Sequence, residues 1–446
     1  MVQEGGLRAP VRKSLEIDND RFWNSEDLDK ELRRQFDVCH SCRRCFNLCD
    51  SFPKLFDLVD ETPTGDVHTV DEDKFWQVID NCYLCDTCFK TKCPYVPPHE
   101  WNVDFPHLML RAKAVKFSEG RVKTRDKLLT STVAVGKFAG LPIVSEVTNA
   151  INKIPTMRKV IEKVSGIHSE APIPRFERPS YRQAISKSEN RVSALAEQQK
   201  DNENVPKVAL FVTCYGNQNS PDLVLDMQQV FEHNGIQLRV IKSDSCCGMP
   251  KFELGDLESV KKFAQQNMTE MKELVDQGYV ITAPIPSCVL MYRKELPLLL
   301  PNEGSVQRIA GAMRDPFEIL MDLKRSGQLY TDFKTELGNV AYHAPCHQRV
   351  QNIGYKTKEI LELVPNTNVT LIERCSGHDG TYAVKKESYP QAKKICRPIV
   401  RAIDKSAPDI FISDCPMAFD LIDQGTERSS AFKSAFAALK FAYGVE

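Results

Sequence analysis

Two runs of closely spaced cysteines near the start of the chain constrain its fold more than any other feature. Each run has three cysteines at two-residue gaps and a fourth a few residues later. The first run is Cys39, Cys42, Cys45 and Cys49, and the second is Cys82, Cys85, Cys88 and Cys93. Iron–sulfur clusters are held by four thiolates, and in two-cluster ferredoxins the fourth cysteine of each run ligates the other cluster.

This crossed arrangement predicts two ligand sets for two [4Fe–4S] clusters. One set is Cys39, Cys42, Cys45 and Cys93, and the other is Cys82, Cys85, Cys88 and Cys49. Two zinc sites are the alternative, since zinc also takes four thiolates. The gap between Cys88 and Cys93 is one residue longer than in the usual run. The fourth cysteine of the first run, Cys49, is followed by Asp50, whereas proline usually follows the fourth cysteine. We expect residues 21–106 to form a helical ferredoxin-type module with two clusters.

The other features of the chain suggest a reducing compartment for its sixteen cysteines. The first twenty residues contain no apolar stretch of signal-peptide length, and no window approaches the roughly 20 apolar residues of a membrane span. We therefore expect a cytoplasmic protein, in which cysteine clusters bind metals or transfer electrons and a disulfide framework is the weaker interpretation. The net charge of −1 provides no global field for nucleic acid, so no nucleic-acid partner is expected.

The remainder of the chain divides by composition and pattern. Residues 1–20 are predicted to form a loose arm, 107–185 a basic helical connector, and 186–206 a polar linker without aromatic residues. Beyond the linker, β-rich runs alternate with helical patterns, which indicates βαβ units and parallel sheets. The alternation occurs twice, over a first lobe at 207–335 and a second lobe at 336–446. The expected fold is α+β and multi-domain, with the helical module preceding two repeated α/β cysteine-rich lobes.

The cysteines of the two lobes follow one pattern. Each thiol or thiol pair comes just after a predicted strand, where sites in doubly wound sheets usually lie. The first lobe has Cys214, Cys246, Cys247 and Cys288, and the second has Cys346, Cys375 and Cys415. Aligned, the lobes define five thiol positions, of which the first lobe lacks the one at Ile285 and the second lacks those at Ser376 and Ala418. Cys396 fits no position and is expected in the core.

Four thiols in the first lobe suffice for a further iron–sulfur centre, whereas three in the second leave open a cluster with a foreign ligand, another metal or no metal. Three histidines near the second set offer extra ligands, proton donors or structural hydrogen bonds: His343, His347 and His378. The chain has no Gly-x-Gly-x-x-Gly fingerprint after a strand and no Walker loop, so no FAD, NAD or ATP site is expected. A flavin or nicotinamide would then belong to a partner.

The Cys246-Cys247-Gly248 and Cys375-Ser376-Gly377 segments, together with the two N-terminal runs, resemble a known family. This is the CCG-domain family of iron–sulfur oxidoreductases, which includes heterodisulfide reductase subunits and the C subunit of anaerobic glycerol-3-phosphate dehydrogenase. The resemblance covers roughly residues 35–440. It implies electron transfer between a flavoprotein partner and a quinone or disulfide acceptor, and a non-cubane cluster where the five-thiol pattern is complete. The missing thiols leave cubane and non-cubane clusters open for the first lobe.

Three functions remain open at this point. The chain could be an electron-transfer subunit of an oxidoreductase complex, a stand-alone disulfide or quinone reductase acting at Cys246 and Cys247, or a redox sensor. The segment from Arg111 to Val164 contains twelve basic residues and four acidic ones. This net +8 is either the solvated face of ordinary helices or a surface for anionic lipid, which would give peripheral attachment to the inner face of the membrane.

Overall fold

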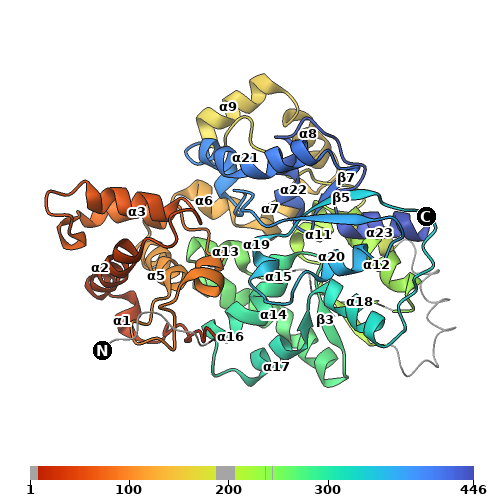
Figure 1. Cartoon of the computed structure of the whole chain (residues 1–446), viewed down its shortest axis with the longest axis horizontal. Coiled ribbons are helices and arrows are strands. Elements are labelled where there is room, and N and C mark those ends of the chain that lie inside the picture. Colours follow the sequence, from red (N-terminus) through yellow and green to blue (C-terminus); the bar gives the residue numbers. More distant parts are fainter. Residues whose placement is uncertain (1–8, 187–205, 237, 244, 446) are drawn as a thin grey trace.

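The computed structural model describes residues 9–186, 206–236, 238–243 and 245–445 (Figure 1). The N-terminal part is helical, as predicted. Its elements are α1 (Asp20–Trp23), α2 (Ser25–Cys42), α3 (Ser51–Asp60), the 3₁₀ turns η1 (Val67–Thr69) and η2 (Glu72–Phe75), α4 (Trp76–Ile79) and the π-helical turn η3 (Cys88–Lys92). Helix α2 begins where the Asn24 side chain accepts a hydrogen bond from the amide of Asp27, and it buries Leu28, Leu32 and Phe36 at four-residue spacing.

Residues 9–19 pack against the body of the protein, although the sequence suggested a loose arm. Leu15 is buried, and its amide donates to the carbonyl of Leu298 at 2.8 Å. The side chain of Arg12 is 5% exposed and bonds to Asp104 at 2.8 Å. A buried guanidinium needs such carboxylate partners, and these hold the segment in place. The earlier part of the predicted arm lies outside the described residues.

The basic connector is helical and links the N-terminal part to both lobes. It contains α5 (Phe105–Ser118), α6 (Thr124–Leu129), α7 (Thr132–Ala139), α8 (Val144–Ile151) and α9 (Pro155–Ser165). Arg125 on α6 donates to Glu387 in the second lobe at 2.7 Å, and Ile167 forms an antiparallel bridge with Lys385. Nearly all of the linker predicted at 186–206 falls outside the described residues. Within the described ranges, no helix combines the length and apolarity that a membrane crossing requires.

The first lobe is built on a parallel sheet of order β2-β1-β3-β4. Its strands are β1 (Val208–Leu210), β2 (Leu238–Val240), β3 (Val280–Thr282) and β4 (Met313–Arg314). The helices are α11 (Cys214–Gln218), α12 (Pro221–His233), α13 (Met249–Leu254), α14 (Leu257–Asp276), α15 (Pro286–Leu290), the π-helical turn η4 (Met291–Glu295), α16 (Leu296–Leu299), α17 (Gly304–Ala312) and α18 (Pro316–Arg325). Strand β1 is buried along its whole length, as a central parallel strand should be.

The second lobe repeats this topology with a parallel sheet of order β6-β5-β7. Its strands are β5 (Asn339–His343), β6 (Asn368–Ile372) and β7 (Ile410–Ser413). The helical elements are α19 (Cys346–Arg349), α20 (Lys356–Leu361), the 3₁₀ turn η5 (Tyr382–Val384), α21 (Tyr389–Ser406), α22 (Pro416–Asp423) and α23 (Ala435–Tyr443). In both lobes the first strand lies between the second and the third, so the predicted repeat of parallel α/β units is confirmed.

The two lobes also exchange elements at their boundary. The last helix, α23, belongs to the second lobe in sequence but packs against α12 of the first. Phe436 on α23 stacks on Phe317 of α18 at 4.6 Å between ring centroids. Helix α18, from the first lobe, in turn contacts α20 of the second. This exchange joins the two lobes, and Figure 1 shows α23 beside α12.

Candidate functional site

The first N-terminal set of cysteines gathers where α2 ends. Helix α2 carries Cys39 and Cys42 in its last turn and stops at Arg43, whose φ of 51° turns the chain toward Cys45. Burial raises the pKa of the Cys39 thiol well above its ordinary value, and the nearby thiols of Cys93, Cys45 and Cys42 raise it further. The structure therefore brings Cys93 from the second run to the three leading cysteines of the first run.

The second N-terminal set gathers around a small cavity. Burial raises the pKa of the Cys88 thiol, and the neighbouring thiols that add to this effect include Cys82, Cys85 and Cys49. These four cysteines line a cavity of about 100 Å³, which Cys346 and Cys375 of the second lobe also reach. In the structure, each fourth cysteine thus lies near the three leading cysteines of the other run.

All seven predicted ligands of the two lobes line one larger cavity of about 170 Å³ between the sheets. Each lies just beyond the carboxyl end of a strand, as expected for parallel α/β units. The wall from the first lobe presents Cys214, Cys246, Cys247 and Cys288, and the wall from the second presents Cys346, Cys375 and Cys415. The sequence predicted two separate lobe sites, and the docking of the lobes combines them into one.

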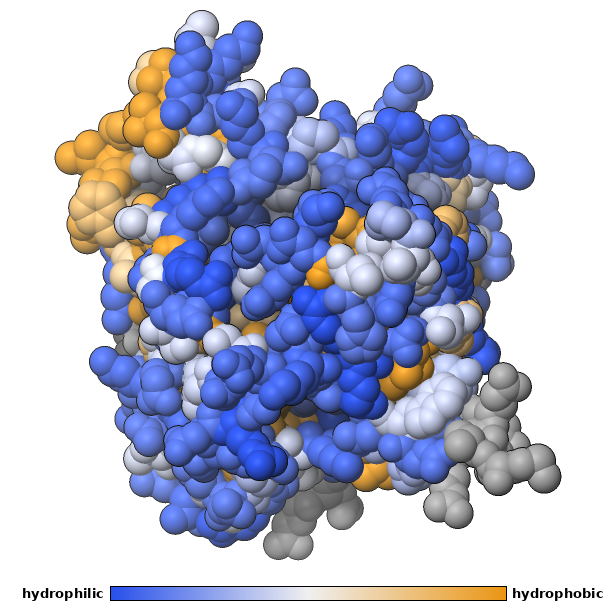
Figure 2. All heavy atoms as spheres, turned by 90° about the vertical axis from the view of Figure 1, so that its left-hand side faces the viewer, coloured by the Kyte–Doolittle hydropathy of each residue, from blue (hydrophilic) through white to orange (hydrophobic). Residues whose placement is uncertain are grey.

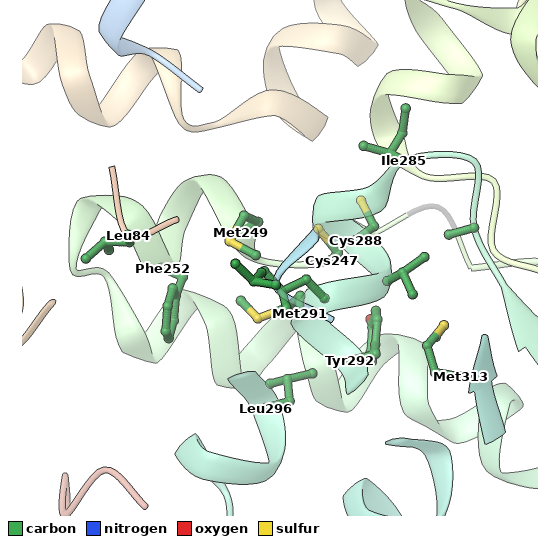
Figure 3. Packing of buried hydrophobic residues seen from close by; sticks show 14 of the residues in the cluster. Leu84, Cys247, Met249, Phe252, Ile285, Cys288, Met291, Tyr292, Leu296 and Met313 are labelled. Atoms are coloured by element: carbon green, nitrogen blue, oxygen red, sulfur yellow. The ribbon is translucent and has the colours of Figure 1, made fainter. Parts of the chain in front are cut away.

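The thiols of the first lobe contact one another. The Sγ atoms of Cys214 and Cys246 are 3.9 Å apart, and the backbone N–H of Gly248 donates to Cys246 at 3.4 Å. Hydrogen bonds from Cys214 and Cys247 hold the pKa of Cys246 well below its ordinary value. In Figure 3, Cys247 and Cys288 lie side by side between Met249 and Ile285. This corner therefore offers a thiolate already surrounded by donors.

Thr132 on α7 is a member of this group that sequence reasoning missed. Its hydroxyl lies 3.3 Å from the Cys214 sulfur and 3.5 Å from the Cys246 sulfur. Hydrogen bonds to cysteine sulfurs tune the potentials of iron–sulfur centres. A threonine in a separate helix, far before the cysteines in the sequence, has no local pattern that could identify it.

The second lobe repeats the backbone geometry of the first. The N–H of Gly377 donates to the Cys375 sulfur at 3.3 Å, as Gly248 does to Cys246. The Cys346 thiol donates to Cys85 of the second N-terminal set, and this bond lowers the pKa of Cys85 to about 6. A direct thiol contact therefore joins the small N-terminal cavity to the large cavity between the lobes.

The three histidines of the second lobe all line the large cavity but differ in their hydrogen bonding. Burial lowers the pKa of His343, His347 and His378 to about 4, so their imidazoles are neutral near pH 7. His343 uses both ring nitrogens within the protein, at 2.9 Å to the Ser413 hydroxyl and 3.0 Å to the Arg374 carbonyl. The buried Nε2 atoms of His347 and His378 have no hydrogen-bond partner among the described residues.

The donor set fits a thiolate-bound group better than a single ion. No pair of cysteines forms a disulfide in the described chain. Over the same residues, no three or more His, Cys, Asp and Glu side chains are arranged to hold one metal ion. Four thiols around a cavity suit a cluster, whose four thiolates surround several irons. Cys396 lies away from both cavities, buried beneath the carbonyl of Leu421, as expected for a core residue.

The comparisons with known proteins agree with this arrangement. A cysteine-rich domain family matches residues 208–293 and again residues 340–417. The chain is 27% identical over 318 residues to the C subunit of the anaerobic glycerol-3-phosphate dehydrogenase of Escherichia coli (strain K12), covering 70% of this chain and 76% of that protein. It is 28% identical over 218 residues to lactate utilization protein A of Bacillus pumilus, covering 47% of this chain and 87% of that protein.

Proposed function

Because this chain carries two cysteine-rich domains and is homologous to the C subunit of anaerobic glycerol-3-phosphate dehydrogenase, we propose that it is an iron–sulfur electron-transfer subunit of an oxidoreductase complex. It relays single electrons between two N-terminal [4Fe–4S] clusters and a metal centre at the cavity between the lobes. A flavoprotein dehydrogenase or another redox protein is the partner at one end, and a quinone or disulfide is the acceptor at the other.

One observation carries this proposal: the thiols form a continuous series through the molecule. The first N-terminal set adjoins the second, because the charge of the Cys45 thiolate is close enough to raise the pKa of the Cys88 thiol. The second set adjoins the cavity between the lobes, because Cys346 bonds to Cys85. Cys85 lines both the small and the large cavity. Closely spaced centres along such a series would permit electron hopping, whereas isolated structural metal sites need no such contact.

The ligand sets follow from these neighbours. Cys39, Cys42, Cys45 and Cys93 would hold one cluster, Cys82, Cys85, Cys88 and Cys49 the second, and Cys214, Cys246, Cys247 and Cys288 a further centre. When bound, such clusters supply one-electron redox chemistry. The protein's own contribution is to exclude water from the thiols and to direct the Gly248 amide and the Thr132 hydroxyl at the Cys246 sulfur. Cys346, Cys375 and Cys415 remain candidate ligands for a centre in the second lobe.

Substitution of one N-terminal cysteine tests the proposal. In Cys42→Ser, we expect the anaerobically purified chain to lose about four irons, because the first set then holds only three thiolates. Cys396→Ala is the matched control, because Cys396 is buried but contacts neither cavity. Iron and sulfide counts on both variants are the measurement. A colourless, zinc-containing wild-type chain, or equal iron in wild type and Cys42→Ser, would contradict the proposed ligand set.

The cavity between the lobes favours one second function, a stand-alone reductase of disulfides or quinones at Cys246 and Cys247. Seven thiols of the two lobes, together with Cys85, line a space of about 170 Å³, which is room for part of a small substrate. Turnover of a small disulfide or quinone by the isolated chain would support this function. Activity only after a flavoprotein is added would support the electron-transfer subunit instead.

The surface of the connector supports peripheral membrane attachment. Large apolar side chains are exposed there, with Phe138 67%, Ile143 71% and Val164 84% accessible. In Figure 2, apolar side chains gather at the upper left of the molecule, at the height of α9 in Figure 1. Basic residues of the same segment give it a net charge of +8. An apolar face with basic neighbours is the composition that binds anionic lipid surfaces.

Vesicle binding tests this attachment. We expect the intact protein to sediment with vesicles of phosphatidylcholine and phosphatidylglycerol at low salt, and less at high salt because salt screens the lysines. The double variant Phe138→Ser/Ile143→Ser should lose most of this binding. Val11→Ser removes a similarly exposed apolar side chain elsewhere and should leave vesicle binding unchanged. Equal sedimentation of the double variant and wild type would rule out this surface.

A further inference from the structure

The two lobes have diverged at matching positions around the shared cavity. Superposing Cys246 on Cys375 pairs Met249 with His378, and superposing Cys214 on Cys346 pairs Tyr215 with His347. The pairing is supported by the backbone, since Gly248 and Gly377 both have positive φ and donate to the cysteine sulfur two residues earlier. The second lobe therefore carries imidazoles where the first has a thioether and a phenol.

The second lobe also lacks two thiols that the first lobe carries, although it has Cys415 where the first lobe has Ile285. Ser376 stands where the first lobe has Cys247, and Ala418 where it has Cys288. A hydroxyl and a methyl group are poor replacements for thiolates. The wall formed by the second lobe is thus poorer in sulfur and richer in nitrogen than the wall formed by the first.

Each of these two imidazoles has one ring nitrogen that no described residue engages. The Nε2 atoms of His347 and His378 are buried and unpartnered among the described residues. His378 is 9% exposed, and both residues line the large cavity. A buried polar group without a partner is unfavourable, so native proteins usually provide a protein, water or ligand partner for it. His343 provides the contrast, because both of its nitrogens are already bonded.

We propose that His347 and His378 are positioning residues that hydrogen-bond a carbonyl-bearing acceptor, of the quinone class, in the cavity between the lobes. This inference rests on the proposed function, which brings electrons to the same cavity. The remaining lining includes Met249, Ile285 and Met417, which suit the apolar body of such a ring. Carbonyl oxygens accept hydrogen bonds well, whereas divalent sulfur accepts them weakly, so the imidazoles favour a quinone over a disulfide.

Binding to the iron-loaded, anaerobic chain tests the proposal, with menadione as the quinone probe and 2-hydroxyethyl disulfide as the sulfur probe. The double variant His347→Phe/His378→Met installs apolar groups, the second being the residue of the first lobe. We expect its Kd for menadione to rise about tenfold, the effect of losing two hydrogen bonds of roughly 0.7 kcal/mol each. Binding of the disulfide should be unchanged. In the single variant His378→Gln, which keeps a donor and an acceptor, we expect a Kd within about threefold of wild type.

Iron and sulfide counts on the same samples separate this inference from the proposed function. An iron-poor wild-type chain would overturn the proposed function, whereas unchanged iron with unchanged menadione affinity in the double variant would overturn only the role of the histidines. A loss of iron in the double variant would also overturn that role, because the imidazoles would then be metal ligands. His233→Phe is the control, because the Nε2 atom of His233 is also buried and has no partner among the described residues but lies outside the large cavity, so its menadione affinity should equal that of wild type.

Discussion

Gly255 ends helix α13 at the point where that helix touches α5. Its φ is +88°, and a Cβ placed there would lie 2.4 Å from the carbonyl carbon of Lys113 and 2.6 Å from the nitrogen of Ala114. Both contacts are with the backbone of a long helix, which cannot move aside without disturbing the N-terminal part. Helix α13 directly follows the Cys246–Cys247 pair, so this glycine sets the distance between the pair and the N-terminal module.

Gly255→Ala should therefore destabilise the protein by roughly 2–4 kcal/mol, from the positive φ and the steric overlap together. Gly278→Ala is the matched control, since Gly278 has a φ of +84° but a Cβ added there would meet nothing within 4 Å. It should lose only about 1–2 kcal/mol, the cost of the backbone conformation alone. Urea unfolding midpoints measured anaerobically distinguish the two. Equal losses in both variants would show that α5 yields to the added methyl group.

At the scale of elements, the segment before α1 joins three parts of the fold. Arg12 bonds to Asp86 of the second cysteine run, to Asp104 at the start of α5 and to Glu295 at the end of η4 at 3.5 Å. Its guanidinium also lies 4.6 Å from the ring centroid of Phe89. One buried cation thus neutralises carboxylates from the N-terminal module and from the first lobe.

Arg12→Met should cost about 3–5 kcal/mol of stability, because it leaves those buried carboxylates without their counter-charge. Arg12→Lys should recover part of the loss, since an ammonium keeps the charge but not the forked geometry. Lys13→Met, next in sequence but exposed, should change stability by less than about 0.5 kcal/mol. Urea unfolding of the three variants is the measurement. A fully stable Arg12→Met would mean that the segment is held by its apolar residues alone.

Local sequence patterns could predict the order of helices and strands along the chain. The β-rich runs and the helical spacings gave the strand and helix order of both lobes, because buried parallel strands and amphipathic helices have characteristic periods. The two-residue strand β4 was missed, since Met313–Arg314 is too short to show a period. The packed segment around Arg12 was missed as well, because its partners lie 74 or more residues away.

At the scale of the whole molecule, the sequence could supply the thiols but not their shared cavity. The crossed pattern of two-cluster ferredoxins predicted that each fourth cysteine joins the opposite run, and the structure places these thiols near one another. The contact between Cys85 and Cys346, and the meeting of both lobes at one cavity, depend on how the N-terminal module and the two lobes dock. Docking is decided by non-local packing, such as α23 against α12, which no local period reveals.

That docking interface contains a buried polar network with two carboxyl groups. Asp315 caps α18 by accepting from the amide of Phe317 at 2.9 Å, and Gln348 of the second lobe donates to it at 3.3 Å. The same Gln348 nitrogen donates to Asp414 at 3.1 Å. Burial, with the nearby Asp414 charge adding to it, raises the pKa of Asp315 to about 7. The interface therefore favours a protonated Asp315.

This raised pKa predicts a pH dependence of stability. The carboxyl of Asp315 ionises near 3.8 in the unfolded chain and near 7 in the folded one. Between these values the folded state binds the extra proton, so this group's stabilising contribution is complete below about pH 4 and is lost as the pH rises to 7, by roughly 1.4 kcal/mol per unit.

Asp315→Asn keeps an oxygen for the helix cap and cannot ionise, so it should gain stability relative to wild type as the pH rises from about 5 to about 8. Asp315→Ala, which lacks the cap, should remain about 1 kcal/mol below the asparagine variant at every pH. Anaerobic urea unfolding across this pH range measures both differences, and a constant offset between wild type and Asp315→Asn would show that Asp315 is already ionised in the folded interface.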